Sequence, residues 1–418
     1  MDRIVVEGGR RLKGNVRISG SKNAALPVLV SSLLVDGECV FHNVPDLVDI
    51  KSIKLLLEDL GARVETNGDT VMIDASTVHK FEASYDLVRK MRASILVLGP
   101  LLARQKKARV SLPGGCAIGA RPINLHLKGM ENLGATITLE HGYVEAHADA
   151  LVGNDIYFDV VSVGATENMM MTAVLATGVT LLRNAAREPE ITALADVLIQ
   201  MGAQIEGAGT SVIKITGVTS LKPVEVQIIP DRIEAGTFMV ASAMTGGDVT
   251  ITDCTPDHMG GIIHKLKLSG ATVLVNGSSI QVIGSDEIKS LDIQTLPYPG
   301  FPTDMQAQFM AMMTVAKGTS VFRETIFENR FIHVSELIRM GADISLSGGN
   351  VATVKGVARL SSAPVMASDL RASASLILAG LIAQGTTVVS RVYHLDRGYE
   401  SLERKFEMLG GAVRREKD

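Results

Sequence analysis

Hydrophobic and polar positions repeat along this chain with a period of about 70 residues, and the period recurs six times. Each period opens with a segment rich in Ala, Leu and Met that is apolar on nearly every face of a helix. Such a pattern predicts a helix that is buried all round. The six predicted buried helices span residues 23–34, 93–103, 168–176, 235–243, 306–316 and 372–383.

The remainder of each period predicts a strand, an amphipathic helix and a hairpin. Short apolar runs such as 39–41 are strand-like, and residues 49–60 and 191–201 have apolar positions at helical spacing. A glycine then ends the helix, as glycine commonly does, and two alternating strands follow around a turn such as Asn67-Gly68. The marker at the helix end recurs every 68 to 73 residues, as Gly61-Ala62, Gly134-Ala135, Gly202-Ala203, Gly270-Ala271, Gly341-Ala342 and Gly410-Gly411-Ala412.

The last period has one hairpin strand fewer than the others. Residues 3–8 resemble the second hairpin strands at 279–284 and 352–356, so we expect the N-terminus to supply the missing strand. A chain of 418 residues is also too long for one ordinary core. We therefore expect an α/β protein of two domains with three repeats each, one formed by 21–229 and the other by 1–20 together with 230–418.

Composition and charge narrow the class of protein. Hydrophobic residues make up 46% of the chain and aromatic residues 4%, with no Trp, so the core is aliphatic. The formal net charge of −4 disfavours nucleic-acid binding. The N-terminus has no apolar signal core, and the longest apolar runs are too short to span a bilayer, which predicts a cytoplasmic protein without a membrane partner. The cysteines and histidines match no metal motif and the glycines match no dinucleotide motif, so we expect neither a metal nor a cofactor.

The segment 112–122 concentrates glycine and proline around one thiol, Leu-Pro-Gly-Gly-Cys-Ala-Ile-Gly-Ala-Arg-Pro. This composition excludes an ordinary helix or strand and predicts a shaped loop. A cation five residues after Cys116 favours the thiolate, which makes Cys116 a candidate nucleophile or proton donor. A lone cysteine is otherwise most often a packing residue. We interpret Cys39 and Cys254, and the methionines at 169–171, in that way.

Charged and polar residues recur directly before the predicted buried helices. Unpaired N–H groups and the dipole at a helix N-terminus favour anions. Lys22, Arg92 and Arg371 share this position and predict an anion site, whereas Asp231 and Asp369 are equally compatible with plain helix caps. The six segments are Lys22-Asn23, Lys90-Met91-Arg92, Ser162-Val163-Gly164, Asp231-Arg232, Thr303-Asp304 and Asp369-Leu370-Arg371.

Ten strings of this chain together resemble one family, the UDP-N-acetylglucosamine 1-carboxyvinyltransferases. The strings are long and specific, and they extend over essentially the whole chain. They begin at Ser19 (SGSKNAA), Met91 (MRAS), Leu112 (LPGGCAIGARP), Ser162 (SVGAT), Ala186 (AREPE), Pro230 (PDRIE), Phe301 (FPTDMQ), Phe327 (FENR), Asp369 (DLRAS) and Asp396 (DRGYE).

The resemblance implies both a fold and a reaction. The fold is the two-domain inside-out α/β barrel of enolpyruvyl transferases, with six βαβαββ-type repeats, three per domain, an active site in the cleft between the domains, and the Cys116 loop as its lid. The reaction transfers the enolpyruvyl group of phosphoenolpyruvate to the 3′-hydroxyl of UDP-N-acetylglucosamine by addition–elimination, with release of phosphate. This is the first committed step of peptidoglycan synthesis, which implies roles in cell wall biogenesis, cell shape, the cell cycle and cell division.

By the same resemblance, four residues are catalytic: Cys116, Asp304, Lys22 and Arg397. Cys116 is expected to protonate the methylene carbon and to form a covalent 2-(S-cysteinyl)pyruvic acid adduct, and alkylation of this thiol makes the family a fosfomycin target. Asp304 is expected to act on the sugar hydroxyl, either as a base or as an orienting group. The supporting residues are Arg330 and Asp369.

The resemblance also assigns two overlapping sets of binding residues. The set for phosphoenolpyruvate consists of Lys22, Asn23, Arg92, Arg121, Arg371 and Arg397, since arginine suits both the carboxylate and the phosphate. The set for UDP-N-acetylglucosamine consists of Asn23, Arg92, Arg121, Pro122, Ile123, Asn124, Leu125, Ser162, Val163, Gly164, Asp304 and Ile326.

This chain departs from some relatives at Asn124 and Val160, where they carry Asp and Lys. His126, close behind the Cys116 loop, is compatible with a ligand contact or with a helix cap. Two alternatives to the function are a 5-enolpyruvylshikimate-3-phosphate synthase, which would lack the Cys loop and the string from Lys22, and an inactive paralogue that serves as a binding module. An inactive paralogue is expected to have an eroded site, whereas the candidate residues are all present.

Overall fold

The computed structural model describes residues 2–89, 91–112, 118–119 and 122–417, and these divide into two compact units. Unit 1 consists of the N-terminal segment up to Ser19 and of Pro230–Asp418, joined by Ile118 and Gly119. Unit 2 runs from Gly20 to Ile229 apart from those two loop residues. The chain therefore crosses between the units after Ser19 and again after Ile229.

Each unit contains three four-stranded sheets of the same topology. In each sheet an edge strand pairs in parallel with a second strand. The second strand pairs antiparallel with one strand of the hairpin, and the two hairpin strands pair antiparallel with each other. In one sheet of unit 2, for example, Ile156 lies opposite Leu182 in the parallel pair, and Leu182 lies opposite Ile213 in the antiparallel pair. A parallel pair requires a crossover connection, and a buried helix supplies it in four of the sheets. In the other two sheets, β2 pairs with β15 and β14 pairs with β3, so the two parallel strands are far apart in sequence. The βαβαββ order is thus present six times.

The elements of unit 2 follow this order from the first crossing onward. Its strands are β3 (Glu38–His42), β4 (Arg63–Asn67), β5 (Thr70–Asp74), β6 (Glu82–Ala83), β7 (Lys107–Ser111), β8 (Thr136–Glu140), β9 (Tyr143–His147), β10 (Asp155–Tyr157), β11 (Val179–Arg183), β12 (Gln204–Glu206), β13 (Val212–Thr216) and β14 (Glu225–Gln227). Its helices, with 3-10 helices written η, are α1 (Lys22–Ser31), η1 (Ser32–Leu34), α2 (Val48–Leu60), α3 (Tyr85–Val88), η2 (Arg92–Val97), α4 (Leu98–Gln105), α5 (Asn124–Asn132), α6 (Val163–Ala173) and α7 (Pro189–Gln200).

Unit 1 repeats the arrangement with elements from both ends of the chain. Its strands are β1 (Asp2–Glu7), β2 (Lys13–Arg17), β15 (Asp248–Thr252), β16 (Thr272–Asn276), β17 (Ser279–Ile283), β18 (Ile293–Gln294), β19 (Thr319–Arg323), β20 (Asp343–Ser347), β21 (Val351–Lys355), β22 (Pro364–Met366), β23 (Thr386–Ser390) and β24 (Ala412–Lys417). Its helices are α8 (Arg232–Met244), η3 (Pro256–Met259), α9 (Gly260–Leu268), η4 (Thr303–Met305), α10 (Gln306–Met313), α11 (Val334–Arg339), α12 (Leu370–Ile382), η5 (Val392–Arg397) and α13 (Leu402–Met408).

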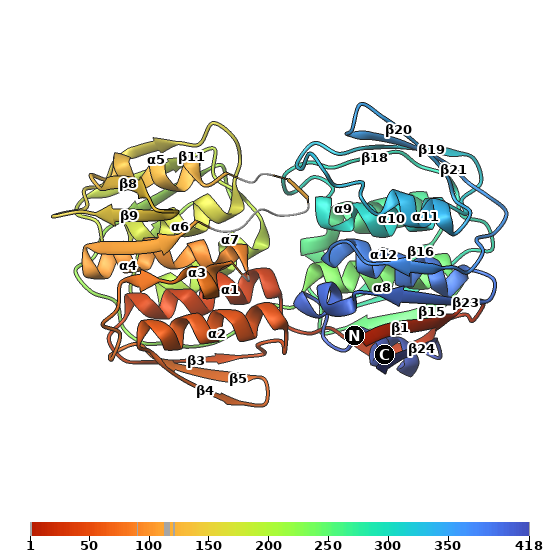
Figure 1. Ribbon diagram of the computed structural model, residues 1–418, viewed down its shortest axis with the longest axis horizontal. Helices are drawn as coiled ribbons and strands as arrows, with labels where there is room; N and C mark the ends of the chain where they lie inside the picture. Colours follow the sequence, from red (N-terminus) through yellow and green to blue (C-terminus); the bar gives the residue numbers. More distant parts are fainter. Residues whose placement is uncertain (1, 90, 113–117, 120–121, 418) are drawn as a thin grey trace. The chain divides into compact units, whose positions relative to one another are not determined.

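The buried helices form the centre of each unit, and the sheets cover them from outside. In unit 1, α8, α10 and α12 pack against one another, and Figure 1 shows them between the sheet of β18–β21 and the sheet that contains β1, β23 and β24. In unit 2, α1 and α4 both pack against α6. The prediction of helices buried all round is confirmed, since every residue of α10 and all but one of α8 are buried. An α/β fold with helices inside and sheets outside is therefore confirmed.

One predicted helix has a different start from the one expected. The segment 93–103 is a 3-10 helix up to Val97 and an α-helix only from Leu98. Pro100 explains the change, because proline has no N–H to donate and is accommodated in the first turn of an α-helix. The short first strands of the repeats were also not predicted from the hydrophobic pattern, and two of them, β6 and β18, contain only two residues.

The six marker glycines all end their helices in the left-handed region, with φ between 83° and 109°. Side chains other than that of glycine rarely adopt this conformation, so the marker has a backbone cause. At the end of α2, for example, the Gly61 N–H donates to Glu58 O and the Ala62 N–H to Leu57 O. The interpretation of the markers as helix stops is confirmed.

The N-terminal strand completes the last repeat. Strand β1 lies between β23 and β24 and pairs antiparallel with both, so that Val5 lies opposite Val388 on one side and Arg414 on the other. Ile4 and Val6 are fully buried in the core of unit 1. The expectation for residues 3–8 is confirmed.

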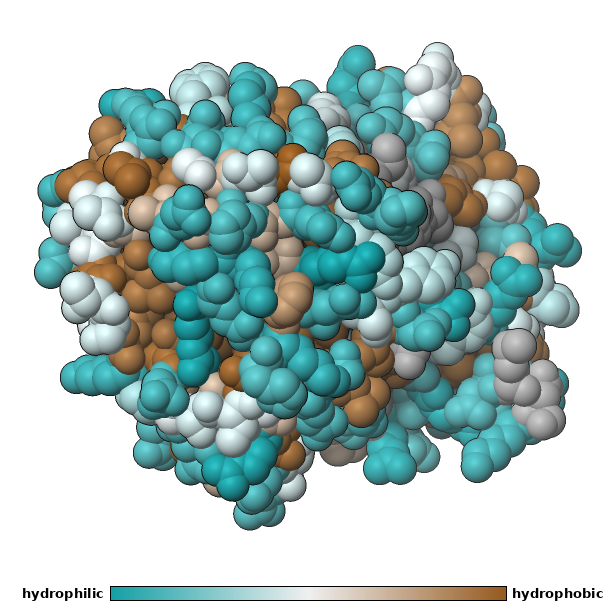
Figure 2. Space-filling model, turned by 60° about the vertical axis from the view of Figure 1, so that its left-hand side comes forward, coloured by the Kyte–Doolittle hydropathy of each residue, from teal (hydrophilic) through white to brown (hydrophobic). Residues whose placement is uncertain are grey.

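Packing roles proposed from the sequence are also confirmed. Met169, Met170 and Met171 are fully buried, and Cys39 and Cys254 are 0% and 3% exposed. Burial raises the pKa of the Cys254 thiol to about 11 and also raises that of Cys39, so both stay protonated at neutral pH. None of the described helices is both long enough and apolar enough to cross a bilayer. On the face in Figure 2, apolar areas are interrupted by charged and polar side chains.

Candidate active site

In unit 1 the residues before the buried helices meet at Asp304. Asp304 lies in η4, directly before α10, and its two carboxylate oxygens each accept a hydrogen bond of 2.9 Å, one from Arg330 and one from Arg371. The guanidinium groups are nearly inaccessible, with side chains 5% and 3% exposed, whereas the Asp304 side chain is 26% exposed. One partly open carboxylate is thus held by two buried cations.

A polar network beneath this cluster joins the three central helices. The hydroxyls of Thr237 in α8 and Tyr399 lie 2.8 Å apart, and Gln308 Nε2 of α10 donates to the carbonyl of Asp304 at 2.9 Å and to the Tyr399 hydroxyl at 3.2 Å. The Arg371 guanidinium lies 5.3 Å from the centre of the Tyr399 ring. Burial alone would lower the pKa of Arg371, but the charge of Asp304, together with Tyr399 and Asp231, outweighs it and raises that pKa.

The two aspartates whose role was open are helix caps in this structure. The Asp231 carboxylate accepts from the N–H groups of Ile233 and Glu234 at the start of α8, at 2.8 and 3.0 Å. The Asp369 carboxylate does the same for Arg371 and Ala372 at the start of α12. The cap on α12 therefore also fixes the backbone of a residue that binds Asp304.

Glu324 is a further member of the cluster that the sequence did not reveal. Its carboxylate is 2% exposed and accepts from Thr303 in η4 at 3.0 Å, from Thr295 at 2.8 Å and from the Ile326 N–H at 2.8 Å. Glu324 thereby ties Ile326, which is 37% exposed, to the turn that carries Asp304. A glutamate directly after strand β19 was the available signal, but its partners Thr295 and Thr303 are more than 20 residues away in sequence.

Arg397 is the last residue of η5 and is half-buried. The neighbouring Gly398 explains how this end of η5 approaches α12. A Cβ at position 398 would lie 2.6 Å from a Leu370 methyl group at the start of α12, so a larger residue would require the Leu370 side chain to move. The next residue is Tyr399, which lies beneath Arg371 in the network described above.

In unit 2, Lys22 and Asn23 form the first turn of α1, capped by the Ser21 hydroxyl, which accepts from Ala24 N at 3.3 Å. Lys22 Nζ lies 3.4 Å from Asp49 Oδ2 of α2, and these side chains are 12% and 4% exposed. Because Pro27 carries no N–H, α1 leaves the Asn23 carbonyl without its usual helical donor. Arg92 begins η2, which packs against α1.

The remaining predicted residues of unit 2 lie at two other helix starts. Pro122 and Ile123 precede α5, and Asn124 and Leu125 form its first turn. Ser162 caps α6 by accepting from Ala165 N at 3.3 Å, and Val163 and Gly164 are the first residues of that helix. Val160, before this cap, is 62% exposed.

The structure thus brings Asp304, Arg330 and Arg371 into direct contact in unit 1, with Asp369 and Ile326 linked to them. In unit 2 it places the predicted residues at the starts of four helices. Cys116 and Arg121 lie outside the described residues; of their loop, Gly119 and Ile118 are described, and the Asn329 N–H donates to Ile118 O at 3.1 Å within unit 1.

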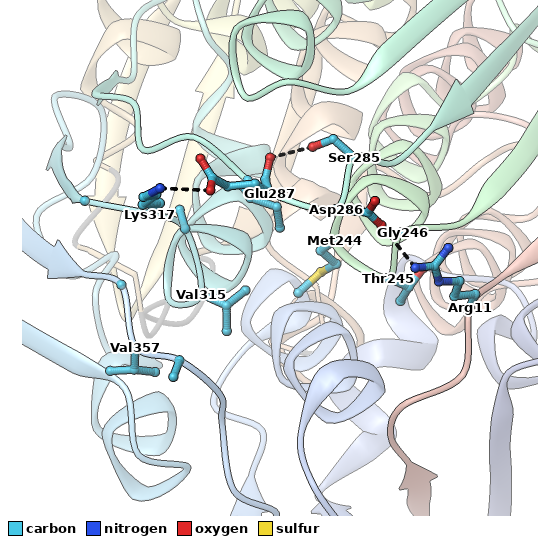
Figure 3. Close-up of a pocket in the computed structure, with 15 residues that line it drawn as sticks. Arg11, Met244, Thr245, Gly246, Ser285, Asp286, Glu287, Val315, Lys317 and Val357 are labelled. Atoms are coloured by element: carbon cyan, nitrogen blue, oxygen red, sulfur yellow. Dashed lines mark hydrogen bonds and ion pairs between the residues drawn. The ribbon is translucent and has the colours of Figure 1, made fainter.

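A cavity of 540 Å³ in unit 1 contains none of the predicted residues (Figure 3). It lies at the opposite ends of the central helices, where Thr245 follows α8 and Val315 follows α10. Its charged lining is exposed and paired, Arg11 with Asp286 at 3.1 Å and Lys317 with Glu287 at 3.0 Å.

Comparison with known proteins gives consistent results. A family model described as EPSP synthase (3-phosphoshikimate 1-carboxyvinyltransferase) matches residues 6–406. The UDP-N-acetylglucosamine 1-carboxyvinyltransferases of Desulforapulum autotrophicum and Desulfosudis oleivorans are 65% and 67% identical to this chain, over 100% and 99% of both chains. The crystal structure of the enolpyruvyl transferase NikO from Streptomyces tendae superposes with a TM-score of 0.90 at 26% identity, covering 99% of this chain and 98% of NikO.

An EPSP synthase from Acinetobacter baumannii has the same fold, with a TM-score of 0.77 at 18% identity over 100% of both chains. Likeness at that identity supports the fold alone, whereas the full-length relatives at 65% identity and above carry the other name. The chain belongs to the UDP-N-acetylglucosamine 1-carboxyvinyltransferase family of enolpyruvyl transferases.

Proposed function

We propose that this protein transfers the enolpyruvyl group of phosphoenolpyruvate to the 3′-hydroxyl of UDP-N-acetylglucosamine and releases phosphate. The observation that carries the proposal is full-length identity of 65% and 67% to relatives of that name. The 5-enolpyruvylshikimate-3-phosphate synthase alternative has only the family description and a fold likeness at 18% identity in its favour.

The reaction needs cations for the carboxylate and phosphate of phosphoenolpyruvate. Arg371 lies in the first turn of α12, after the Asp369 cap, and Arg92 is the first residue of η2. At both places backbone N–H groups and the helix dipole add to the charge of the arginine. Lys22 stands at the equivalent place on α1. We assign these residues, with Asn23, Arg121 and Arg397, to phosphoenolpyruvate.

Addition begins when a proton reaches the methylene carbon and makes C2 electrophilic, like an oxocarbenium ion. We assign this proton to the Cys116 thiol, because an ordinary thiol pKa near 8.5 keeps it protonated at neutral pH. The 3′-hydroxyl then bonds to C2 and loses its proton. Elimination breaks the bond from C2 to the phosphate oxygen, returns a methyl proton to the protein and leaves the enol ether. Attack of the Cys116 thiolate on C2 instead gives the covalent adduct.

Asp304 is assigned to the sugar hydroxyl. Arg330 and Arg371 each occupy one oxygen of its carboxylate, yet a carboxylate oxygen has more than one lone pair and the side chain is 26% exposed. Two guanidinium groups at 2.9 Å stabilise the ionised form, which favours orienting the hydroxyl over removing its proton outright. Pro122 to Leu125, Ser162 to Gly164 and Ile326 are assigned to the rest of the sugar nucleotide, where Asn124 and Val160 contribute no charge.

The proposed reaction commits sugar nucleotide to peptidoglycan and so places the protein in cell wall biogenesis, with consequences for cell shape and division. Both substrates are water-soluble cytoplasmic metabolites, and we propose that the protein acts in the cytoplasm as a target of fosfomycin.

The first experiment measures phosphate release from phosphoenolpyruvate alone, with UDP-N-acetylglucosamine, and with shikimate 3-phosphate. We expect release that depends on the sugar nucleotide. Release only with shikimate 3-phosphate would keep the fold and overturn the acceptor, and no release from folded protein would favour the inactive paralogue.

Replacement of the thiol tests the role of Cys116. Cys116→Ser is expected to reduce turnover at least 100-fold and to abolish the mass increase that fosfomycin produces, because a hydroxyl is a much weaker acid and nucleophile. Cys254→Ser is the matched control, since the Cys254 thiol is buried and its pKa is raised to about 11. Full turnover in Cys116→Ser would remove the thiol from the mechanism.

A further inference from the structure

A buried histidine and asparagine connect α5 and α6 of unit 2 with α4 and η2. His126 in α5 is 6% exposed and Asn168 in α6 is fully buried, and His126 Nδ1 lies 3.1 Å from Asn168 Nδ2. Asn168 also accepts from the Gly99 N–H of α4 at 2.8 Å and donates to the Ile95 carbonyl of η2 at 3.0 Å. The asparagine side chain therefore has backbone partners in two further elements, α4 and η2.

These backbone partners determine which way the amide of Asn168 faces. The Gly99 N–H is a donor and requires the amide oxygen, whereas the Ile95 carbonyl is an acceptor and requires the amide nitrogen. The reversed orientation would set donor against donor and acceptor against acceptor in a buried place. The group that faces His126 is consequently an N–H donor.

The orientation of the amide in turn fixes the form of the imidazole. His126 Nδ1 must accept from Asn168 and cannot carry a proton, so the ring is neutral and its proton is on Nε2. Nε2 lies beside the start of α6, 3.6 Å from the position that a Cβ on Gly164 would take. One ring thus bridges the first turn of α5 and the first turn of α6.

We propose that His126 is a positioning residue for the sugar nucleotide, held by Asn168 as the neutral Nε2–H tautomer. The inference rests on the proposed function, because the two turns that His126 joins are those assigned to the nucleotide, Pro122–Leu125 and Ser162–Gly164. The His126 ring lies against both turns and sets the distance between them. The binding of a ligand that contacts both turns therefore depends on this ring. Of the residues assigned to phosphoenolpyruvate, only Arg121 is adjacent in sequence to one of these turns, so the binding of phosphoenolpyruvate depends less on that distance.

The tautomer is testable on the unmodified protein. With histidine labelled by ¹⁵N in the ring, His126 is expected to show an unprotonated Nδ1 and a protonated Nε2 between pH 6 and 8. A protonated Nδ1 would overturn the proposal whatever reaction the protein catalyses, so this measurement is independent of the proposed function.

Binding of UDP-N-acetylglucosamine to the free protein tests the positioning role. In His126→Phe the ring remains but its acceptor is lost, and a buried donor without a partner costs enough to weaken binding about tenfold. In His126→Asn an amide oxygen takes the place of Nδ1, so binding is expected within threefold of wild type. The KM for phosphoenolpyruvate at saturating sugar nucleotide is expected to change less than twofold in both variants.

Thr172→Val is the matched control. Thr172 is fully buried one turn along α6, and its hydroxyl donates to the backbone carbonyl of Asn168 at 2.7 Å without reaching His126. This variant is expected to lower the thermal midpoint but to leave both substrates' binding unchanged. Wild-type protein that binds no sugar nucleotide would refute the proposed function. Normal wild-type binding with equal losses for both substrates, or with no rescue in His126→Asn, would refute the positioning role alone.

Discussion

Asp304 neutralises two guanidinium groups that are almost completely removed from water. In Asp304→Asn the oxygen that accepts from one arginine remains, but the negative charge that both arginines face is lost. Removing one partner from a buried ion pair costs about 3 kcal/mol, which for a unit of this size lowers the thermal midpoint by roughly 6 to 12 °C. Turnover should fall at least 100-fold, measured as phosphate release at saturating substrates.

An exposed ion pair of unit 1 provides the control for this prediction. Asp286 is 92% exposed and pairs with Arg11 at 3.1 Å, so Asp286→Asn is expected to change stability by less than about 0.5 kcal/mol. If Asp304→Asn melts at the same temperature as Asp286→Asn, the Asp304 charge does not stabilise the buried arginines.

His333 is predicted to make stability depend on pH in a defined window. It is 1% exposed, and burial, together with the nearby charge of Arg330, lowers its pKa from the ordinary 6.5 to about 4, although Asp369 acts in the opposite direction. Above pH 6.5 the residue is neutral in both folded and unfolded chains. Below it the unfolded chain binds a proton first, so stability is lost progressively as the pH falls from 6.5 towards 4, by roughly 3 kcal/mol in all.

Comparison of wild type with His333→Gln isolates this contribution, since glutamine does not titrate. The thermal midpoints of the two proteins are measured from pH 7.5 to 4.5, and we expect the wild-type curve to fall more steeply. Parallel curves would show that His333 is protonated in the folded protein or reaches water.

At the level of single residues, the sequence predicted the charged groups and missed those that hold them. Lys22, Arg92 and Arg371 were found because they precede a recurring pattern. Glu324 and Gln308 were missed because the partners that define their roles are distant in sequence, Thr295 and Thr303 for Glu324 and Thr237 and Tyr399 for Gln308. For Gln308, the available signal was a polar residue within a helix that is otherwise apolar on every face, since such groups are buried only with partners.

Among the elements, the N-terminal ends of the buried helices combine two tasks. A cap must satisfy backbone N–H groups, and the same place attracts anionic ligands, so one short segment serves both stability and binding. Asp231 illustrates the first task. Its carboxylate accepts from two N–H groups of α8, and it is 5% exposed.

The cap predicts a clear contrast between two variants. Asp231→Ala removes both hydrogen bonds and is expected to cost about 1 kcal/mol, or roughly 2 to 4 °C in the thermal midpoint of unit 1. Asp231→Asn keeps an acceptor oxygen in the same place and is expected to lose less than half of that. Equal losses in the two variants would mean that the charge of Asp231, rather than its cap, supports this end of α8.

The hydrophobic pattern was sufficient for the long elements and insufficient for the short ones. Each buried helix is long enough for its continuous apolar run to be recognised, and each hairpin has a turn signal. Strands such as β6 and β18, with two residues each, contain too few positions for any alternation to appear. They exist because a neighbouring strand offers a free edge, which is a property of the assembled sheet and not of the segment.

For the whole molecule, the repeat explains why the two chain ends lie in one sheet. Five repeats carry both hairpin strands in sequence, and the sixth takes its second strand from the N-terminus. Residues 2 and 417 lie opposite each other in that hairpin, as Asn276 and Ser279 do in another repeat, where a tight turn joins them. The fold therefore specifies the hairpin and leaves the place of the chain break undetermined.

A circular permutant tests this view directly. Joining residue 417 to residue 2 through an Asn-Gly turn, and opening the chain after Gly277, closes the split hairpin and splits an equivalent one. Since no strand pairing is lost, we expect soluble protein with a thermal midpoint within about 5 °C of wild type and sugar-nucleotide-dependent phosphate release.

The control permutant is opened after Thr250, inside β15, and it is expected not to fold, because β15 pairs with β17 on one side and with β2 on the other. If the first permutant fails as the second does, the natural position of the break is itself needed to build unit 1, and the six repeats are not interchangeable.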